Sequence, residues 1–419
     1  MKVEKCKGFK DLSPDEMESF RLIEGIFRDA CLKWGYREVR TPTLEYLYLF
    51  TSVGTLTPGM LRRVYSFLDW DGWSGERVVM KPDGTIPVAR MYIEDIKKGL
   101  ARLFYITSVF VFEETGKKSR EKWQCGAELI GENTLVVDVE LIALALDVLK
   151  RLDIKDVSIK ISHAGMIRAL LEKLDLSQAE KDRLFDKILD GNLAAIKDVK
   201  AENPELAEIL DLMLKMKGKS SGFLKNIKAL TEGKLPQLKK PLDNFIAVVE
   251  MLDKLECEYK IDLSSGKGFE YYTGIIFNIY AGKEIIGGGG RYDNLIPQMG
   301  GKTKQAAGFA LYMNSLMKLV ESKIMAKPLK ERVIVKIDPQ AVKEALELAD
   351  KLRSAGMIVE LELSEEAAAG CGWRLEVQSC SPAFKLIDLS DNRTGICDGT
   401  AELMLLLGCE ADDAEDSPT

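Results

Sequence analysis

The sequence has almost no histidine, since His163 is the only one among its 419 residues. A metal site built from several imidazoles is therefore impossible, and a Ser-His-Asp triad would depend on this one side chain. His163 continues the apolar alternation of VSIKIS, which is typical of a β-strand. We therefore expect His163 to have a structural role at the end of a strand or in the core, and we expect no metal site.

The sequence also lacks any apolar run of the roughly 18 residues that a membrane-spanning helix needs. Its opening segment, MKVEKCKGFKDLSPDEM, has no apolar stretch of the kind found in secretory signal peptides. The eight cysteines are scattered without a CxxC pair, which in a chain of this length indicates reduced, mostly packed thiols. Together these absences predict a soluble, cytoplasmic protein with no membrane partner.

Positive charge is scarce toward the C-terminus. Residues 331–419 contain 8 Lys and Arg against 19 Asp and Glu, a net charge of −11, whereas the remainder of the chain carries +4. A surface of that sign is a poor platform for the phosphate backbone of nucleic acid. We therefore do not expect nucleic acid as a partner, and we expect residues 411–419 to form a disordered acidic tail.

The first part of the chain predicts a helix followed mainly by antiparallel strands. LSPDEM begins a helix because Ser13 can cap it, Pro14 suits its first position and Glu16 completes a capping box. The helical periodicity then continues to Gly35. Further elements are predicted from alternation and periodicity: a strand over 36–50, a hairpin over 64–83, a short helix over 85–96, strands over 102–114 and 123–131, and an amphipathic helix over 134–151.

The chain changes character between about residues 163 and 255, where Leu, Lys, Asp and Glu recur at helical spacing. Strand patterns return over 259–265, 269–280 and 284–296, and a helix is predicted over 306–322. A β-α-β pattern follows the linker KIMAKPLKER. The predicted fold class is therefore α+β: residues 1–325 form an antiparallel sheet flanked by helices and interrupted by a helical insert, and residues 331–410 form a small α/β domain.

Four consecutive glycines, residues 287–290, are the densest functional signal in the sequence. Glycine lets a backbone or a ligand approach closely, but no Lys-Ser/Thr pair follows as in a phosphate loop. A tight strand crossing or a bulge is the structural alternative. Tyr271 and Tyr272 stand nearby in a predicted strand, where alternation would direct one to a pocket and the other into packing. Ordinary packing of both tyrosines remains a second alternative.

Two further segments offer polar side chains at suggestive spacing. Asp83 and Thr85 occupy a turn before a helix and could present a carboxylate and a hydroxyl to an amine, although simple capping of that helix is equally consistent. Gln124, Gly126 and Glu128 alternate along one strand face, where Gly126 would open a slot between two polar side chains. A solvated strand face is the alternative for this second group.

Taken in order, these segments resemble histidyl-tRNA synthetase, a class II aminoacyl-tRNA synthetase, from Gly8 to about residue 320. The segments that carry the resemblance are GFKDLSPDE, GYREVRTPTLE (motif 1), KPDGTIPVAR, FVFEETGKKSREKWQCGAELIG (motif 2), GKGFEYYTG (the histidine motif), the glycine loop GGGGRYDNL, and AAGFALYMNSL (motif 3). The resemblance implies a class II synthetase-like antiparallel sheet with helices, dimerisation through motif 1, and a vestigial anticodon-binding domain at residues 331–410.

The sequence departs from that family where the nucleotide is held. Val111 follows the first Phe of motif 2 where the family has Arg, and Tyr312 and Ser315 replace the Gly and Arg of motif 3. Lys267 replaces the Arg of the histidine motif. A lost guanidinium fork can cost about 3–4 kcal/mol of charge stabilisation, and Tyr312 would also crowd the nucleotide. We therefore expect no catalytic residues, no cofactor and no adenylation activity.

The contacts that hold the amino acid in the family look better kept. Asp83 stands where the family has a Glu for the α-amino group, and Glu128 with a tyrosine could hold the two nitrogens of an imidazole. The resemblance thus implies a histidine-binding site made of Asp83, Thr85, Gln124, Glu128, Lys267, Tyr271, Tyr272, Gly288, Gly289 and Arg291.

A sequence that keeps the histidine contacts but loses the nucleotide contacts is similar to the regulatory subunit of ATP phosphoribosyltransferase, a noncatalytic paralog of the synthetase. That resemblance implies free histidine as ligand, a short-form ATP phosphoribosyltransferase catalytic subunit as partner, a homodimer core within a hetero-octamer, and feedback control of histidine biosynthesis. Two alternatives stay open. A divergent histidyl-tRNA synthetase would need Lys117, Lys118 or Arg120 to replace the lost arginines, and a repurposed paralog would bind another amino acid or act as a scaffold.

Overall fold

The computed structural model divides the chain into two compact units, Met1–Ile324 and Met325–Thr419. It describes residues 3–52, 64–70, 75–96, 99–112, 119–132, 134–189, 208, 211, 213–233, 235–255, 258–264, 271–324, 332–363 and 371–408. The predictions about Lys267 and about the acidic tail at 411–419 lie outside these residues. None of the helices within these ranges is long and apolar enough to span a membrane.

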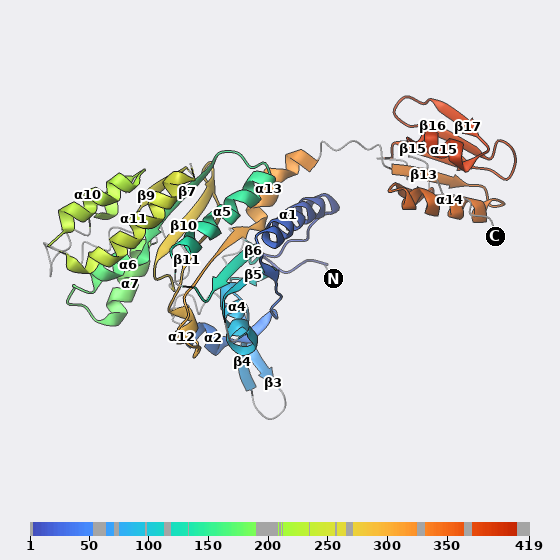
Figure 1. The fold of residues 1–419 in the computed structure, drawn as a ribbon. Coiled ribbons are helices and arrows are strands. Elements are labelled where there is room, and N and C mark those ends of the chain that lie inside the picture. Colours follow the sequence, from blue (N-terminus) through green and yellow to red (C-terminus); the bar gives the residue numbers. More distant parts are fainter. Residues whose placement is uncertain are drawn as a thin grey trace. The chain divides into compact units, whose positions relative to one another are not determined.

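A nine-stranded sheet forms the centre of the first unit, in the order β1-β5-β6-β12-β11-β10-β7-β9-β8 (Figure 1). Its strands are β1 (Arg37–Glu38), β5 (Ala101–Phe110), β6 (Glu121–Ile130), β12 (Ala306–Tyr312), β11 (Glu284–Arg291), β10 (Ile275–Ala281), β7 (Val157–His163), β9 (Tyr259–Asp262) and β8 (Lys217–Gly218). All neighbours pair antiparallel except β1 with β5 and β7 with β9. The predicted antiparallel sheet is confirmed.

Three helices run along this sheet: α1 (Pro14–Lys33), α5 (Val136–Arg151) and α13 (Met313–Ile324) (Figure 1). The start of α1 is as predicted, since Ser13 Oγ accepts from the Glu16 backbone N–H and the Glu16 carboxylate accepts from the Ser13 N–H. Phe27 of α1 and Leu141 of α5 are fully buried in the main core. Amphipathic helices therefore cover the sheet by burying one apolar face each.

The helical insert begins where β7 ends, at His163. Its helices are α6 (Ala164–Leu171), α7 (Gln178–Leu189), α10 (Ser221–Thr231), the 3₁₀ turn η3 (Pro236–Leu238) and α11 (Lys239–Lys254). The His163 ring packs against Phe245 of α11, with ring centroids 5.8 Å apart, and burial lowers its pKa to about 4. His163 is thus a neutral, packed side chain at a strand end, as expected from the sequence.

A second, three-stranded sheet has the order β2-β4-β3, made of β2 (Leu44–Tyr46), β4 (Gly75–Met80) and β3 (Ser66–Trp70). Near it lie α2 (Leu47–Ser52), α4 (Thr85–Met91), the π-helical turn η1 (Tyr92–Ile96) and α12 (Leu295–Gln298) (Figure 1). The hairpin over 64–83 is confirmed. The strand pattern over 36–50, which Pro42 interrupts, forms two short strands, β1 and β2, in different sheets. It is wrong from Leu47 onward, because a helical turn there buries Leu49 and Phe50 in the core around Val79.

The helix predicted over 306–322 is wrong in its first half. Ala306–Tyr312 forms β12, which pairs with β6 on one side and β11 on the other, and the helix starts only at Met313. Alanine and glycine favour no strand by themselves, but this run of small residues fits between neighbours that leave little room. A Cβ at Gly308 would lie 1.7 Å from Glu128 Oε2. Position in the sheet therefore outweighs the helix propensity of alanine.

In its described residues, 332–363 and 371–408, the second unit has a five-stranded sheet in the order β14-β13-β15-β16-β17 and two helices. Its elements are β13 (Arg332–Ile337), α14 (Val342–Ser354), β14 (Ile358–Leu361), β15 (Trp373–Val377), β16 (Phe384–Asp388), β17 (Thr394–Cys397) and α15 (Thr400–Leu406). The predicted β-α-β pattern is present, because β13 and β14 pair in parallel across α14. Val335, Leu352 and Leu403 share its own apolar core.

Candidate functional site

A cavity of about 510 Å³, measured out to its opening into solvent, lies between the central strands and the turn before α4. Its wall combines a carboxylate, an amide, hydroxyls and glycine backbone. The residues that line it are Asp83, Thr85, Tyr105, Gln124, Tyr271, Tyr272, Ile276, Phe277, Asn278, Gly288, Gly289, Tyr292, Gly308, Phe309, Ala310 and Tyr312. The structure thus brings together most of the binding residues that the sequence predicts, from segments up to 206 positions apart.

Asp83 supplies the negative charge of the cavity wall. It sits in the turn between β4 and α4, where its Oδ1 accepts from the Ile86 backbone N–H at 2.8 Å. Asp83 therefore both caps the start of α4 and lines the cavity, so the two interpretations of this motif are compatible. Burial raises its pKa to about 6, although hydrogen bonds from nearby backbone and from Tyr271 lower it in part. At pH 7 most molecules carry an ionised Asp83.

Glu128 differs from the prediction, because it is fully buried and does not line the cavity. Its Oε1 accepts from the Thr85 hydroxyl at 2.7 Å and from the Tyr105 hydroxyl at 3.2 Å, and its Oε2 accepts from the Tyr292 hydroxyl. Burial raises the Glu128 pKa to about 8. Glu128 is therefore mostly uncharged at pH 7 and orients three hydroxyl-bearing side chains that do line the cavity.

The slot predicted at Gly126 exists, but it holds a side chain of the protein. Tyr105 of β5 lies opposite Gly126 of β6, and a Cβ at Gly126 would lie 2.2 Å from the Tyr105 ring. A Cβ at Gly84 would also lie 2.4 Å from the ring. The absence of a side chain at both glycines therefore leaves room for the Tyr105 ring, whose hydroxyl bonds Glu128.

Tyr271 and Tyr272 both line the cavity, so the prediction that they face opposite sides is wrong. The strand begins only at Ile275, and strand alternation does not apply to the turn that carries the tyrosines. Their ring centroids lie 5.2 Å apart, and the Tyr271 ring meets Tyr292 edge-on at 5.5 Å. The three rings form one aromatic wall.

The glycine run forms the middle of β11 between β10 and β12. A Cβ at Gly289 would lie 2.2 Å from the Gly308 carbonyl oxygen, and one at Gly290 would lie 2.4 Å from that of Ile275. The glycines are therefore required by close strand packing, and Gly288 and Gly289 also line the cavity. Both interpretations of this segment are thus compatible.

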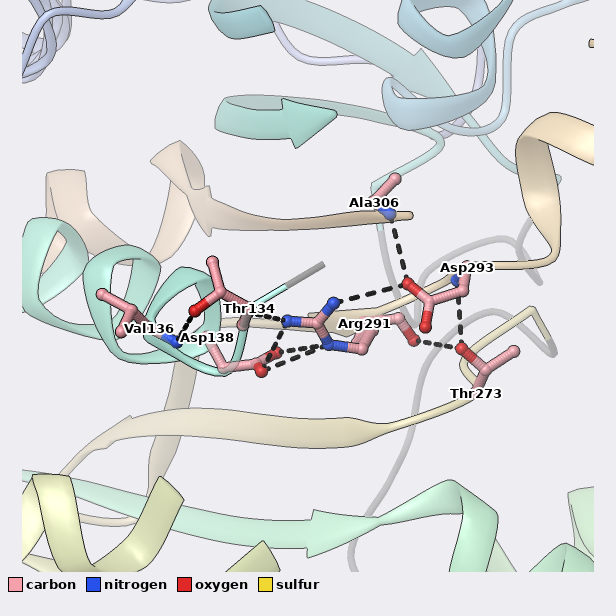
Figure 2. Close-up of polar contacts among 7 residues, drawn as sticks. All are labelled: Thr134, Val136, Asp138, Thr273, Arg291, Asp293 and Ala306. Atoms are coloured by element: carbon pink, nitrogen blue, oxygen red, sulfur yellow. Dashed lines mark hydrogen bonds and ion pairs between the residues drawn. The ribbon is translucent and has the colours of Figure 1, made fainter. Parts of the chain in front are cut away.

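Arg291, which the resemblance places in the binding site, does not line the cavity. Its guanidinium is nearly buried and binds the Asp138 carboxylate of α5, with the shortest contact at 2.8 Å (Figure 2). It also donates to the Thr134 carbonyl oxygen at 2.8 Å. Its charge is thus neutralised within the fold, and we remove Arg291 from the set of expected ligand contacts.

Of the positions that depart from the synthetase motifs, and of the basic residues that could replace the lost arginines, some line the cavity and others do not. Tyr312 lines the cavity, where it takes up space beside Gln124. Ser315 lies outside it and donates to Glu284 at 2.9 Å. Arg120 stacks on the Phe112 ring at 4.0 Å and does not line the cavity. Lys117 and Lys118 fall outside the described residues.

The electrostatics of the cavity follow from these placements. Among its described lining residues, none is Lys, Arg or His. Burial raises the pKa of Tyr105, Tyr271, Tyr272 and Tyr292, so their phenols stay neutral and donate hydrogen bonds. Such a wall suits a ligand with a cationic amine and a flat polar ring.

Nine lining residues were not predicted as site residues, and three of them, Tyr105, Asn278 and Tyr292, bring further polar groups to the wall. Tyr105 lies opposite Gly126 on the neighbouring strand, and Asn278 lies opposite Gly288. Only these strand pairings connect the two residues with the predicted site. Tyr292 directly follows Arg291, the arginine that the resemblance favoured.

The comparisons with known proteins agree in family and fold. The model of the histidyl-tRNA synthetase family matches residues 8–316. A protein of Dehalococcoides mccartyi named ATP phosphoribosyltransferase regulatory subunit is 48% identical over 411 residues, which cover 98% of this chain and 100% of the relative. A protein of Methanocaldococcus jannaschii named histidine--tRNA ligase is 34% identical over 369 residues, covering 86% of each chain.

Two solved structures are similar over most of the chain. An ATP phosphoribosyltransferase regulatory subunit/histidyl-tRNA synthetase from Bacillus halodurans has a TM-score of 0.76 and 26% identity, and covers 90% of this chain and 98% of its own. Histidyl-tRNA synthetase from Nostoc sp. PCC 7120 has a TM-score of 0.75 over 97% of this chain and 99% of its own. At 18% identity, the second comparison supports the fold alone.

Proposed function

The chain belongs to the histidyl-tRNA synthetase family and is 48–49% identical to members named ATP phosphoribosyltransferase regulatory subunit, and we propose that it acts as such a noncatalytic subunit. In this proposal it works in the cytoplasm, binds free histidine in the cavity, and confers feedback control on a short-form catalytic subunit. The alignment to those relatives spans 98% of the chain, so it includes the C-terminal unit as well.

The charge of the cavity is the observation that carries the proposal. Asp83 offers an anion for the α-ammonium group, and the tyrosine wall with Gln124 offers a flat, polar surface for an imidazole. Transfer of an adenylyl group would require cations against the triphosphate, and the described lining residues supply none. The site therefore favours binding of histidine over its activation.

Control of a partner follows from linkage. Histidine shifts the activity of the complex only if it binds two conformations of the assembly with different affinity. A differential of about 1–3 kcal/mol is usual for such coupling. We propose that the chain dimerises through the motif 1 region and that this homodimer forms the core of a hetero-octamer with the catalytic subunit.

Binding is tested by titration calorimetry of the full chain with histidine and with other amino acids. We expect saturable binding of histidine, and in Asp83→Asn an affinity weaker by roughly tenfold or more, because a charge-assisted hydrogen bond is lost. Glu121→Gln is the matched control, since this carboxylate lies on the same strand as Gln124 but does not line the cavity. Tighter binding of another amino acid would favour a repurposed paralog.

Catalysis is tested by histidine-dependent exchange of pyrophosphate into ATP, on protein shown to be folded. We expect no exchange above a blank without histidine. Clear exchange would contradict the noncatalytic assignment and would favour the divergent histidyl-tRNA synthetase instead. The alternative also predicts charging of tRNA, which the same preparation can test.

The partner is tested by mixing the chain with a short-form ATP phosphoribosyltransferase catalytic subunit and measuring mass and activity. We expect a complex whose activity falls when histidine is added. A complex with Asp83→Asn should assemble with the same mass but need a higher histidine concentration for the same inhibition. A complex that forms and stays insensitive to histidine with the native chain would contradict the regulatory role.

A further inference from the structure

A cluster of polar side chains, buried at Arg291 and Asp138 and half-buried at Thr273 and Asp293, lies next in sequence to the tyrosines of the aromatic wall (Figure 2). It consists of Arg291, Asp138, Asp293 and Thr273, which we call the Arg291 clamp. None of the four residues lines the cavity. The clamp draws together the N-terminal turn of α5, the end of β11 and the turn before β10, segments separated by up to 155 positions.

The ion pair with α5 fixes one side of the clamp. Arg291 Nε lies 3.2 Å from both Asp138 oxygens, and its Nη2 lies 2.8 Å from Asp138 Oδ2. Only 7% of Arg291 and 2% of Asp138 is exposed to solvent. A two-pronged contact of this kind restricts the direction of the guanidinium as well as its distance. The side chain of Arg291 is therefore held in a single orientation.

Backbone and hydroxyl contacts fix the other side. The Thr273 N–H donates to the Arg291 carbonyl oxygen at 2.8 Å, and the Thr273 hydroxyl accepts from the Asp293 N–H at 3.0 Å (Figure 2). The Asp293 carboxylate in turn accepts from the Ala306 N–H at 3.2 Å. The turn that carries Thr273 is thus fastened to the end of β11 and to the start of β12.

Clamp residues and cavity tyrosines are neighbours in two short segments. Tyr292 stands between Arg291 and Asp293, and Tyr271 and Tyr272 directly precede Thr273. The clamp and the aromatic wall are therefore carried by the same two short segments, so a shift of either segment moves both. Next to the clamp, a Cβ at Gly274 would lie 2.9 Å from Arg291 Cδ, so the arginine stem also packs against this turn.

We propose that the Arg291 clamp positions Tyr271, Tyr272 and Tyr292, so that affinity for histidine depends on residues that do not touch it. This inference rests on the proposed function, since it takes histidine as the ligand of the cavity. It gives Arg291 the role of a positioning residue in place of a ligand contact.

Thr273→Val tests the clamp with little change of shape, because it removes the hydroxyl and keeps the branched side chain. We expect histidine affinity to fall about five- to tenfold, the effect of losing one or two hydrogen bonds. Thr273→Ser keeps the hydroxyl and should restore affinity to within about twofold. Calorimetry is done well below the unfolding temperature, where a loss of stability alone leaves the affinity unchanged.

Thr231→Val is the matched control, since its hydroxyl donates to the Ile227 carbonyl oxygen at 2.8 Å inside α10, away from the cavity. Its histidine affinity should equal that of the native chain. Equal affinity in Thr273→Val, or no rescue by Thr273→Ser, would overturn the inference.

Amide hydrogen exchange in the ligand-free protein gives a readout that does not need histidine. Thr273→Val should speed exchange in the turn around Thr273 and Gly274, whose N–H groups donate to the Arg291 carbonyl oxygen, while Thr231→Val should not. Unchanged exchange there would also overturn the inference. Absence of histidine binding by the native chain would instead overturn the proposed function. Amide hydrogen exchange would then be the remaining test of whether the clamp holds the turn around Thr273.

Discussion

The carboxyl group of Glu128 and the hydroxyl of Thr85 lie 2.7 Å apart, and both side chains are buried. This contact joins the C-terminal part of β6 to Thr85, the first residue of α4, and it links a buried acidic group to a side chain that lines the cavity. The hydroxyls of Tyr105 and Tyr292 complete the surroundings of the carboxyl group. A carboxyl group in such a setting links stability to pH.

Glu128→Gln should change how stability varies with pH. The folded-state pKa of Glu128 is raised by burial to about 8 from an ordinary value of 4.5, so between these values the folded state holds one more proton than the unfolded state. Stability is then lost as pH rises through this window, by up to about 1.4 kcal/mol per pH unit from this group. Urea unfolding between pH 5 and 8.5 should show a flatter profile for the variant, and parallel profiles would contradict a buried, protonated Glu128.

Histidine affinity should depend on the ionisation of Asp83, whose pKa burial raises to about 6. Below that pH the carboxyl group is protonated and loses its attraction for the ammonium group of the ligand. The ratio of native to Asp83→Asn affinity should therefore fall about tenfold between pH 7.5 and pH 5. Taking the ratio cancels the titration of the ligand's own imidazole. A ratio that does not vary with pH would exclude Asp83 as the anion that binds histidine.

Gly126→Ala should destabilise the fold, because a Cβ there would lie 2.2 Å from the Tyr105 ring. Overpacking of this kind costs about 1–3 kcal/mol. Gly25→Ala in α1 is the control, since nothing lies within 4 Å of its Cβ and the helix should gain about 0.5–1 kcal/mol. Denaturant unfolding of both variants gives the comparison. Equal stability of the two variants would show that Tyr105 can move away without cost.

Arg90→Met should destabilise strongly, because Arg90 binds both oxygens of the buried Glu45 carboxylate at 2.9 Å. Removing one partner leaves a buried charge without compensation, at a cost of about 3–5 kcal/mol. Arg28→Met breaks the more exposed pair with Glu38 and should cost less than about 1 kcal/mol. Thermal unfolding separates these cases, and similar losses in both would mean that burial of Glu45 has little effect.

Elements with local signals could be predicted from the sequence. The capping box at Ser13 and Glu16 specifies the start of α1 without help from the rest of the chain, and the β13-α14-β14 pattern depends on neighbouring segments only. The strand β12 could not be predicted in this way. Its residues Ala306 to Tyr312 become a strand because β6 and β11 bind them from both sides, and nothing local announces that pairing.

The candidate site shows the same division. Asp83 and Thr85 lie in one short motif, and the structure places both in the cavity wall. Arg291 could not be placed from its motif, because its partner Asp138 is 153 residues away in sequence. The contact that turns Arg291 away from the cavity exists only once α5 has packed on the sheet. Motifs therefore locate a site better than they indicate the direction of each side chain.

The packing of the Tyr105 ring against Gly84 and Gly126 also constrains how this sequence can drift over evolutionary time. A methyl group at either glycine would meet the ring, so a change at either position is costly while residue 105 stays aromatic. The reverse order is open: a smaller residue at 105 first, then a larger one at 84 or 126. Positions 84, 105 and 126 should therefore change together. Homologous sequences should show a small residue at 105 wherever either glycine is lost.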